Sequence, residues 1–462
     1  MQVTENKSVA IIGAGIFGLS LAVALRSKGY TVTVFDRNEY DKTGYDPESE
    51  DTQAASVDLN KILRASYGTE LHYQRLALES RQAWVACDKE RGISERNDQD
   101  DRRLFVNSGM LRVQPTDKLS ELEKDTLASM ERDGLRDTQF VKSSPEDRQR
   151  AESLGWKSKL LDFEIPDTEP GQTYDAVLDS LAGFVRCSNA SAYWYKIAVA
   201  KGVVFRFGKE GAIESLVKAP STVEPGKEKV IGIRSEDGAF HDVDTVVVAA
   251  GSFSTQVLPE LSYHLESSAG SVATLKIDIK QTELWDKYSP DNFPVITWKA
   301  TTRDKAGKDT GSIYVLPRTP EGYLKIGSPT SNRPLQELRS HRTGNEFVSI
   351  FLPEFVGVPF SSTKLCWYTD SLDNSFVIDY VPDYAEKSVF VCTGGSGHGA
   401  KFLPVLGEIL ARRDFALDFV ADKQSTKVLG CNFVGLGGFK PRRQEHSVGW
   451  PARKVLDGVS VA

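Results

Sequence analysis

The chain has 462 residues, of which 26% are charged and 40% hydrophobic, and its net charge is −7 at pH 7. This length exceeds what one ordinary core needs and predicts two domains in a soluble globular protein. A nucleic-acid surface would need clustered Lys and Arg, and a membrane span would need a long apolar run. The sequence shows neither, so we expect no nucleic-acid and no membrane partner.

The cysteines and histidines argue against a metal site. The five cysteines form no CxxC pair, and the six histidines form no HExxH motif. Neither a disulfide framework nor a metal centre is therefore expected. Residues 1–8 are polar and lead straight into an apolar segment, unlike a secretory leader. These features together predict a cytoplasmic protein.

The first forty residues predict a strand, a helix and a second strand, at 8–13, 16–28 and 31–36. Between the first strand and the helix stands Gly13-Ala14-Gly15-Ile16-Phe17-Gly18, which fits GxGxxG. Gly13 permits the tight turn, Gly15 admits a pyrophosphate, and Gly18 lets helix and strand pack closely. Asp36 ends the second strand, where a carboxylate can accept hydrogen bonds from ribose hydroxyls. The unit predicts a dinucleotide site.

Further along the chain, residues 41–53 predict a long loop and residues 91–103 an exposed charged segment. Helices are expected at 71–89, within 118–152 (two), and at 190–201. Strands are expected at 203–207, 230–234, 243–250, 274–279, 293–297, 312–316 and 323–326. Residues 389–411 predict a strand, a glycine-rich turn and a helix. The strand at 242–251 ends in Ala250-Gly251 and resembles the second dinucleotide motif of FAD oxidoreductases, which favours FAD over NAD.

Four segments give the chain a specific resemblance. They are the glycine motif, residues 54–68 (AASVDLNKILRASYG), residues 286–289 (DKYS) leading to Phe293-Pro294, and residues 364–379 followed by 394–401 (GGSGHGAK). Together they resemble the D-amino-acid-oxidase superfamily, in its branch of sarcosine oxidases and fungal fructosyl amino acid oxidases. The similarity spans nearly all of residues 8–415.

The resemblance implies roles for individual residues. Cys366 matches the cysteine that bonds covalently to the flavin ring, and Lys287 matches the lysine held over that ring to activate dioxygen. Arg64 and Lys401 match a pair that clamps the substrate carboxylate, which suits a guanidinium fork beside a point charge. Tyr368 matches an active-site tyrosine. Lys61, also assigned to the active site, stands where sarcosine oxidases carry an arginine and fructosyl-amine oxidases a lysine.

The resemblance also implies an α/β fold. We expect a discontinuous Rossmann-like FAD-binding domain of the glutathione-reductase type at 1–85, 155–262 and 360–420. An interleaved α+β substrate domain with a mixed or antiparallel sheet is expected at 86–154 and 263–359, followed by a tail at 421–462. The expected cofactor contacts are Gly13, Gly15, Ile16, Phe17, Gly18, Asp36, Arg37, Ser56, Lys61, Val204, Ala250, Gly251, Cys366, Gly395, Gly397, His398, Gly399 and Lys401.

The implied activity is oxidation of a secondary amine, such as an N-methyl, cyclic or fructosyl amino acid, to an imine while dioxygen becomes hydrogen peroxide. The chemistry belongs to the flavin, which the protein positions and surrounds with charge. Two alternatives stay open. One is a natural-product tailoring oxidase whose iminium product cyclises onto a phenol ring, and the other is a flavin-binding protein without turnover. Residues 437–443 resemble only loosely the tail motif of fructosyl-amine oxidases. The expected partners are an amine and dioxygen, in a monomer or weak homodimer.

Overall fold

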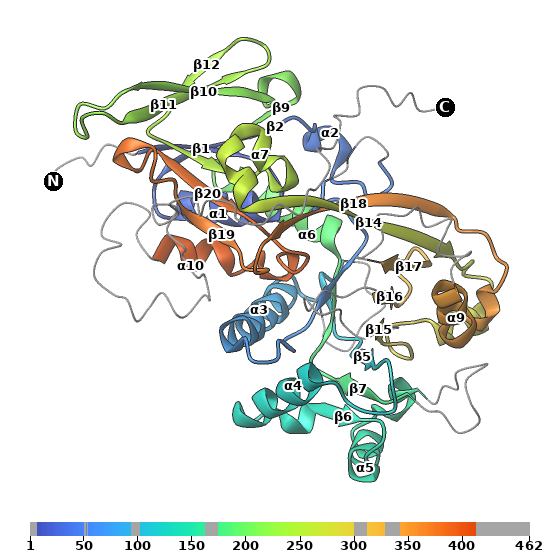
Figure 1. The fold of residues 1–462 in the computed structure, drawn as a ribbon. Coiled ribbons are helices and arrows are strands. Elements are labelled where there is room, and N and C mark those ends of the chain that lie inside the picture. Colours follow the sequence, from blue (N-terminus) through green and yellow to red (C-terminus); the bar gives the residue numbers. More distant parts are fainter. Residues whose placement is uncertain are drawn as a thin grey trace.

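The computed structural model describes residues 7–49, 52, 54–93, 102–161, 174–299, 312–328 and 342–412. The tail at 421–462, with its motif at 437–443, lies outside these ranges. The described chain forms two large sheets side by side, joined by the long strands β14 and β18 (Figure 1).

A six-stranded sheet forms the first half of the molecule, in the order β19-β20-β13-β1-β2-β9. Its five strands from β20 to β9 pair in parallel, and β19 pairs antiparallel with β20. The strands span Ser8–Ile12 (β1), Thr31–Asp36 (β2), Val204–Phe207 (β9), Thr245–Val248 (β13), Val377–Tyr380 (β19) and Val389–Thr393 (β20). Buried parallel strands need apolar side chains on both faces, and the run Ser-Val-Ala-Ile-Ile of β1 supplies them.

Helices cover this sheet. α1 (Ile16–Ser27) packs against α6 (Cys187–Ala200) and α10 (Leu406–Arg412) in the largest hydrophobic cluster. A side chain at Gly18 would collide with the carbonyl of Gly13, so this glycine is what allows α1 to lie so close to β1. α3 (Leu71–Glu90) contributes Tyr73, Leu76, Ala77 and Trp84 to the same cluster and lies below α1 and α10 in Figure 1.

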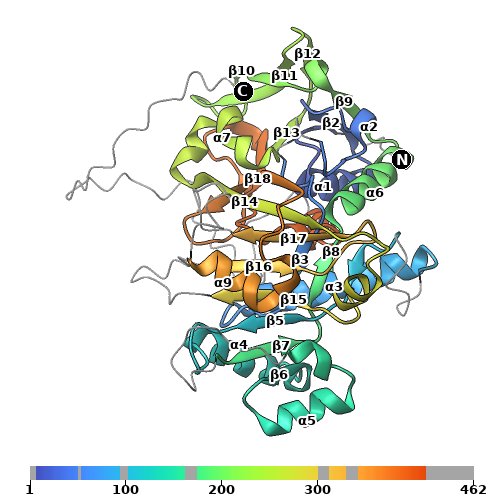
Figure 2. The same cartoon turned by 90° about the vertical axis from the view of Figure 1, so that its right-hand side faces the viewer.

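The second sheet has eight strands in the order β18-β14-β17-β16-β15-β5-β7-β6. Figure 2 shows them descending in this order beneath the six-stranded sheet. All pairs are antiparallel except β15 with β5. The strands span Met110–Val113 (β5), Gln139–Val141 (β6), Ala176–Asp179 (β7), Leu265–Lys276 (β14), Val295–Lys299 (β15), Ser312–Leu316 (β16), Tyr323–Ser328 (β17) and Ser362–Ser371 (β18).

Two three-stranded sheets complete the fold. One contains β3 (Lys61–Leu63), β4 (Phe105–Val106) and β8 (Gly183–Val185), and the other β10 (Ile213–Pro220), β11 (Glu228–Ser235) and β12 (Phe240–Asp242). The remaining helices are α2 (Tyr40–Thr43), α4 (Glu121–Arg132), α5 (Pro145–Ser153), α7 (Ser254–Val257), α8 (Thr282–Lys287) and α9 (Arg342–Phe351). Ser144 caps α5 by accepting a hydrogen bond from the amide of Asp147.

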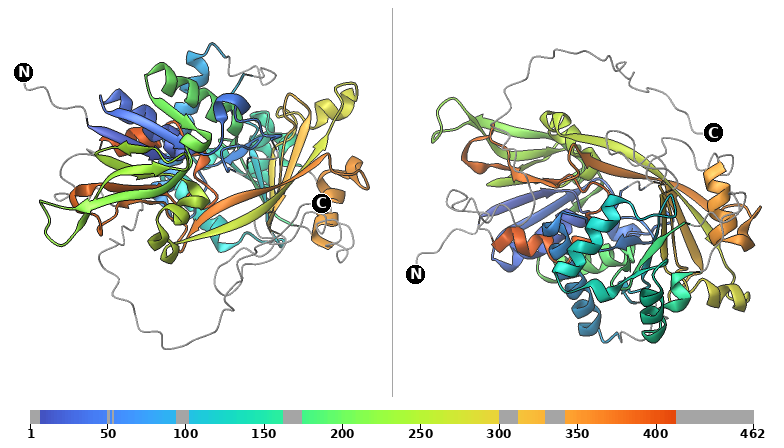
Figure 3. Two further views of the ribbon diagram at one scale, coloured as in Figure 1. Left: turned by 90° about the horizontal axis from the view of Figure 1, so that it is seen from above. Right: turned by 60° about the horizontal axis from the view of Figure 1, so that its bottom comes forward.

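The predicted α/β fold with a mixed second sheet is confirmed, but the two sheets divide the chain differently from the predicted domains. β7 and β18 lie in the ranges assigned to the cofactor domain, yet both belong to the eight-stranded sheet. The reason is pairing: β18 runs antiparallel to β14 along its whole length, a long-range partnership that local sequence does not reveal. Figure 3 shows this ribbon extending from the six-stranded sheet toward α9.

Two segments differ in part from expectation. Residues 41–43 of the predicted loop at 41–53 belong to helix α2, whereas residues 44–49 are irregular as predicted, and Tyr45 is buried there with its ring stacked on Tyr40 at 4.0 Å. In the charged segment 91–103, of which residues 94–101 are not described, Gly92 and Arg102 are exposed but Ile93 and Arg103 are buried.

Candidate active site

A large cavity of about 780 Å³ opens where the parallel strands of the six-stranded sheet end. Its wall includes the residues that follow β1, β2 and β13, the position at which such sheets bind ligands. It extends to β18 and to the glycine-rich turn after β20. Fourteen expected cofactor contacts line it: Gly13, Gly15, Ile16, Phe17, Asp36, Arg37, Ser56, Lys61, Ala250, Gly251, Cys366, Gly395, Gly397 and Gly399. Tyr368 lines it as well.

One end of the cavity is built for a pyrophosphate. Helix α1 begins there without a side-chain cap and without an acidic residue in its first turn. Its first N–H groups, which in any helix have no intrahelical acceptor, here lack a capping side chain as well and present a partial positive charge to the cavity. Gly13 has φ +113°, and a side chain on it would collide with the carbonyl of Ala249. The bare backbone and the uncapped helix fit the dinucleotide half of FAD.

The residues expected to contact the ribose lie beside that helix. The Asp36 carboxylate accepts hydrogen bonds from the amides of Ala14 at 2.8 Å and Asn38 at 2.9 Å, which fix its orientation. Burial raises the pKa of Asp36, and these hydrogen bonds oppose the shift. The hydroxyl of Tyr45 donates to the carbonyl of Ala14 at 2.8 Å, so the segment after β2 secures the glycine motif. The Arg37 guanidinium lies 3.9 Å from the ring centroid of Phe253.

At the other end, Cys366 is buried and begins a chain of charged groups. Its Sγ lies 3.5 Å from the Nζ of Lys61. Lys61 Nζ is 2.7 Å from Asp58 Oδ2, and Lys325 Nζ lies 2.6 Å from the same oxygen. Burial raises the pKa of Asp58, but the two ammonium groups outweigh it and hold that pKa well below its usual range. Asp58 thus lies between the side-chain nitrogens of two lysines.

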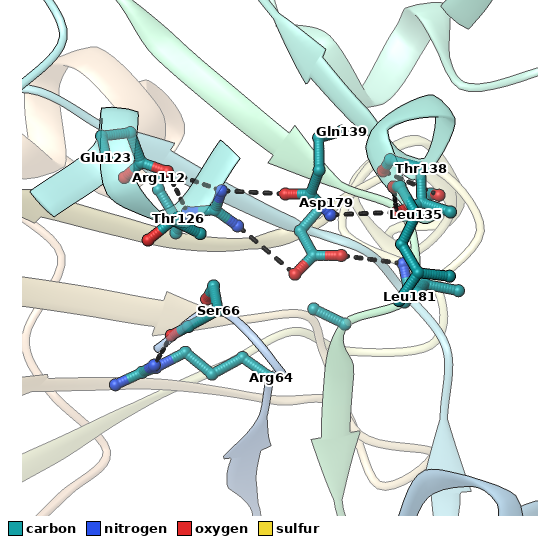
Figure 4. A network of polar contacts seen from close by, with 12 residues as sticks. Arg64, Ser66, Arg112, Glu123, Thr126, Leu135, Thr138, Gln139, Asp179 and Leu181 are labelled. Atoms are coloured by element: carbon teal, nitrogen blue, oxygen red, sulfur yellow. Dashed lines mark hydrogen bonds and ion pairs between the residues drawn. The ribbon is translucent and has the colours of Figure 1, made fainter. Parts of the chain in front are cut away.

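A second pair of cations lies after β3 and after the glycine-rich turn. Lys401 is buried, and its Nζ is 2.6 Å from the hydroxyl of Tyr67. The Arg64 guanidinium lies 4.7 Å from the centroid of the same ring and donates to the carbonyl of Ser66 (Figure 4). Among the described residues, neither cation forms an ion pair with a carboxylate. Burial, reinforced by Arg64, holds the pKa of Lys401 well below its ordinary value.

Neighbouring helices hold this pair in place. From α3, Ser80 and Trp84 donate hydrogen bonds to the backbone carbonyl of Lys401, the latter at 2.8 Å. From α4, Ser129 donates to the carbonyl of Gly68 at 2.5 Å. α4 is itself anchored from below by Arg112, which binds Glu123 on α4, Gln139 on β6 and Asp179 on β7 (Figure 4).

Some expected site residues lie elsewhere. Lys287, expected over the flavin ring, ends helix α8 with its side chain 46% exposed and its Nζ 2.5 Å from Glu354, away from the cavity wall. Val204 stands half-exposed on the edge strand β9 instead of touching the cavity. Gly18 contributes helix packing. Arg64, His398 and Lys401 are not among the wall residues either and lie around Tyr67.

Three residues of the site were not predicted. Tyr45 lies in the segment predicted as a loop, and Tyr67 lies in the motif at 54–68 but was given no role. Lys325 lies in the apolar strand Tyr-Leu-Lys-Ile-Gly-Ser, where it is buried to 1% exposure. A lysine on the core side of such a strand is rarely buried without a partner, and this was the available signal.

Comparisons with known proteins place the chain in a family. The family model described as FAD dependent oxidoreductase matches residues 8–413. The chain therefore belongs to the FAD-dependent oxidoreductases of this family, and the predictions of family, of enzymatic class and of FAD as cofactor are confirmed.

Among its relatives, L-saccharopine oxidase of Schizosaccharomyces pombe is 27% identical over 424 residues, covering 88% of this chain and 90% of the relative. The amino acid oxidase imqH of Aspergillus flavus is 27% identical over 459 residues, covering 87% and 91%. N-methyl-L-tryptophan oxidase of Salmonella heidelberg is 24% identical, covering 77% and 82%. All three are named as oxidases.

Solved structures agree on the fold. The deglycating fructosamine oxidase of Aspergillus fumigatus has a TM-score of 0.66 at 20% identity, covering 92% of this chain and 90% of that one. A fructosyl peptide oxidase has a TM-score of 0.64 at 22% identity, covering 88% and 90%. Among the described residues no helix could cross a membrane, and no cluster of potential metal ligands occurs there.

Proposed function

We propose that this oxidoreductase oxidises the C–N bond of a secondary amine derived from an amino acid and bearing a carboxylate, with dioxygen as the electron acceptor. The observation that carries the substrate class is the pair Arg64 and Lys401: two cations held side by side, one of them fully buried, with no carboxylate of the described chain between them. Burying an unpaired charge is costly, so such a pair is stabilised by an anion that arrives from outside.

The reaction balances without further reagents. The amine R₂CH–NHR′ loses two electrons and two protons to become an imine, and dioxygen takes them up as hydrogen peroxide. Water can then hydrolyse the imine to a carbonyl compound and an amine. FAD, when bound, supplies the two-electron oxidant, and the protein's own groups bind and orient the substrate and fix charge near the reacting atoms.

We assign the attachment of the flavin to Cys366. Its Sγ is buried at the cavity wall, 3.5 Å from the Nζ of Lys61. Protein precipitated with acid should keep its yellow colour, and Cys366→Ala should release the flavin into the supernatant. Cys392 also lines the cavity and provides the matched control, because Cys392→Ala should retain the colour.

The positive charge that favours reduction of dioxygen is assigned to Lys325 instead of Lys287. Lys325 Nζ is held at 2.6 Å from Asp58 and at 2.7 Å from the carbonyl of Asn60. Asp58 connects it to Lys61, which lies at the cavity wall. A cation fixed in advance needs little reorganisation when negative charge develops nearby. Lys287, whose ammonium is half-exposed and paired with Glu354, lacks this setting.

A peroxide assay across a panel of amines tests the proposal. The panel should include N-methyl amino acids, cyclic amino acids, fructosyl amino acids and saccharopine, each beside its methyl ester. Oxidation of the acids in strong preference to the esters is expected. Preference for decarboxylated phenolic N-methyl amines would contradict the carboxylate site and favour a tailoring oxidase. A yellow protein that no panel amine bleaches under anaerobic conditions would contradict the amine class itself.

A further inference from the structure

Tyr67 touches both cations of the anion site. Its hydroxyl lies 2.6 Å from Lys401 Nζ, and its ring centroid lies 4.8 Å from that nitrogen and 4.7 Å from the guanidinium carbon of Arg64. The ring face is negative and attracts both charges. Tyr67 therefore offsets part of the repulsion between the buried Lys401 and the half-buried Arg64.

The hydrogen-bond directions around Tyr67 are determined by its partners. An ammonium only donates, so the Tyr67 oxygen accepts from Lys401. The phenol has a single proton, and its other neighbour is His398 Nδ1 at 3.1 Å. The opposite ring nitrogen, Nε2, lies 3.0 Å from the carbonyl of Asn374, which only accepts. Nε2 therefore carries the imidazole proton, Nδ1 accepts, and Tyr67 donates to it.

This arrangement requires a neutral His398. Burial, reinforced by Lys401 and Arg64, lowers the pKa of His398 to about 3. A protonated ring would turn Nδ1 into a donor, and the Tyr67 oxygen would then face two cationic donors. From Lys401 to Asn374 every hydrogen bond consequently points the same way: ammonium, phenol, imidazole, backbone carbonyl.

Packing fixes the rings that carry this chain. Tyr67 stacks on Tyr73 at 5.4 Å between centroids, and His398 stacks on Phe376 at 4.8 Å. The Tyr73 hydroxyl accepts a hydrogen bond from the amide of Phe376 at 3.0 Å, which joins the two stacks. Neither the phenol nor the imidazole can turn away without breaking these contacts.

We propose that Tyr67 and His398 are positioning residues of the anion site, which hold the Lys401 ammonium by one N–H and leave its other two directed to the substrate carboxylate. This inference rests on the proposed function, since it takes the bound anion to be the carboxylate of the amine. It adds two residues that act through Lys401 and gives each a defined hydrogen-bond role.

The test compares Tyr67→Phe, His398→Leu and His398→Asn. Phe keeps the ring and its contacts with the cations but removes the acceptor for Lys401. Leu removes the acceptor for the Tyr67 proton, whereas Asn can place an oxygen close to the position of Nδ1. KM is measured for one substrate acid and for its methyl ester, across pH, with flavin content and melting temperature recorded for every variant.

Tyr67→Phe should raise KM for the acid roughly 10- to 100-fold, because a hydrogen bond to a charged group is lost. KM for the ester should change far less. The rise of KM for the acid with increasing pH should begin at lower pH, since Lys401 loses an acceptor while Arg64 still faces it and the α3 residues Ser80 and Trp84 offer it no charge. His398→Leu should shift both quantities in the same direction, and His398→Asn should restore them in part.

Two kinds of failure are distinguishable. If Arg64→Ala lowers activity equally for acid and ester, the carboxylate site itself is wrong. If Arg64→Ala is selective for the acid while Tyr67→Phe and His398→Leu leave the acid-to-ester ratio of KM and its pH profile unaltered, only the positioning role is overturned. Should Tyr67→Phe lose its flavin or fold poorly, the pair His398→Leu and His398→Asn decides by the same two readouts.

Discussion

The cluster Lys61–Asp58–Lys325 and the pair Arg64–Lys401 each bring two cations together, but only the first contains a carboxylate, and only the first has a member, Lys61, in the cavity wall. In the first cluster, Asp58 stabilises both ammonium groups, and the pKa of Lys61 lies well above its ordinary value despite burial. In the pair, burial and Arg64 lower the pKa of Lys401. The same residue type is thus held charged in one place and driven toward neutrality in the other.

The difference matches two tasks. A charge that must act on an uncharged molecule such as dioxygen has to be present before that molecule arrives, so its counter-ion belongs to the protein. A charge that must bind a carboxylate gains most when no counter-ion competes for it. Substituting single members of each group tests whether the two groups differ in this way.

The largest effect is expected from Lys325→Met. Removing the fixed charge should slow reoxidation by dioxygen about 100- to 1,000-fold, the size found when one preorganised donor to a developing anion is lost. Anaerobic bleaching by substrate should stay within about tenfold of wild type, because the anion site is intact. Stopped-flow measurement of both half-reactions checks this. Collapse of bleaching with normal reoxidation would assign Lys325 to substrate binding.

Arg64→Ala should come next. Losing a charge-assisted pair costs about 1.5–3 kcal/mol, which corresponds to a rise in KM for the acid of roughly 10- to 150-fold. The ester of the same amine serves as the internal control. Steady-state kinetics on both substrates measures the effect, and an equal loss for both would make Arg64 a structural residue.

A smaller effect is expected in the pH dependence of inhibitor binding. Because the pKa of Lys401 lies below its ordinary value, the free protein loses this charge as pH rises through that lowered pKa, and the affinity for a carboxylate inhibitor falls. Above it, binding should take up a proton, which calorimetry in buffers of different ionisation enthalpy detects. Lys401→Met should abolish the uptake, and Arg64→Ala should move the fall to higher pH by removing a like charge.

The smallest effect belongs to Lys287→Met. Its ion pair with Glu354 is 46% and 32% exposed, so removing it should change the free energy of unfolding by at most about 1 kcal/mol. Reoxidation should match wild type, which makes this variant the control for Lys325→Met. A collapse of reoxidation here would restore Lys287 to the site and remove the contrast between the two clusters.

The fold and the dinucleotide end could be predicted because they depend on local rules. The glycine motif, the strand that precedes it and Asp36 at the end of the next strand follow from spacing along the chain. Lys61 and Cys366, each expected from an extended motif, line the cavity, whereas the role of Arg64 stays a prediction. Lys287 was expected in the site from a short motif alone, and that motif lies at the end of helix α8, which does not line the cavity.

Lys325 could not be found by the same means, because its role depends on three segments that meet only in the folded chain. Asp58 precedes β3, Lys325 lies on β17, and Cys366 lies on β18, with their contacts spanning 267 residues of sequence in one case. Nothing in the spacing of these residues specifies that Asp58 will accept from two lysines. The same holds for the chain from Lys401 to Asn374.

The antiparallel ribbon of β14 and β18 has a mechanical consequence. It continues in register from Leu265–Ser371 to Thr274–Ser362, and one of its strands presents Cys366 to the cavity. A cofactor bound at the N-terminus of α1 at one end and attached to this ribbon at the other would connect the two sheets across the region where they meet. Loading the flavin should then stiffen that joint, and hydrogen–deuterium exchange in β18 should slow in wild type more than in Cys366→Ala.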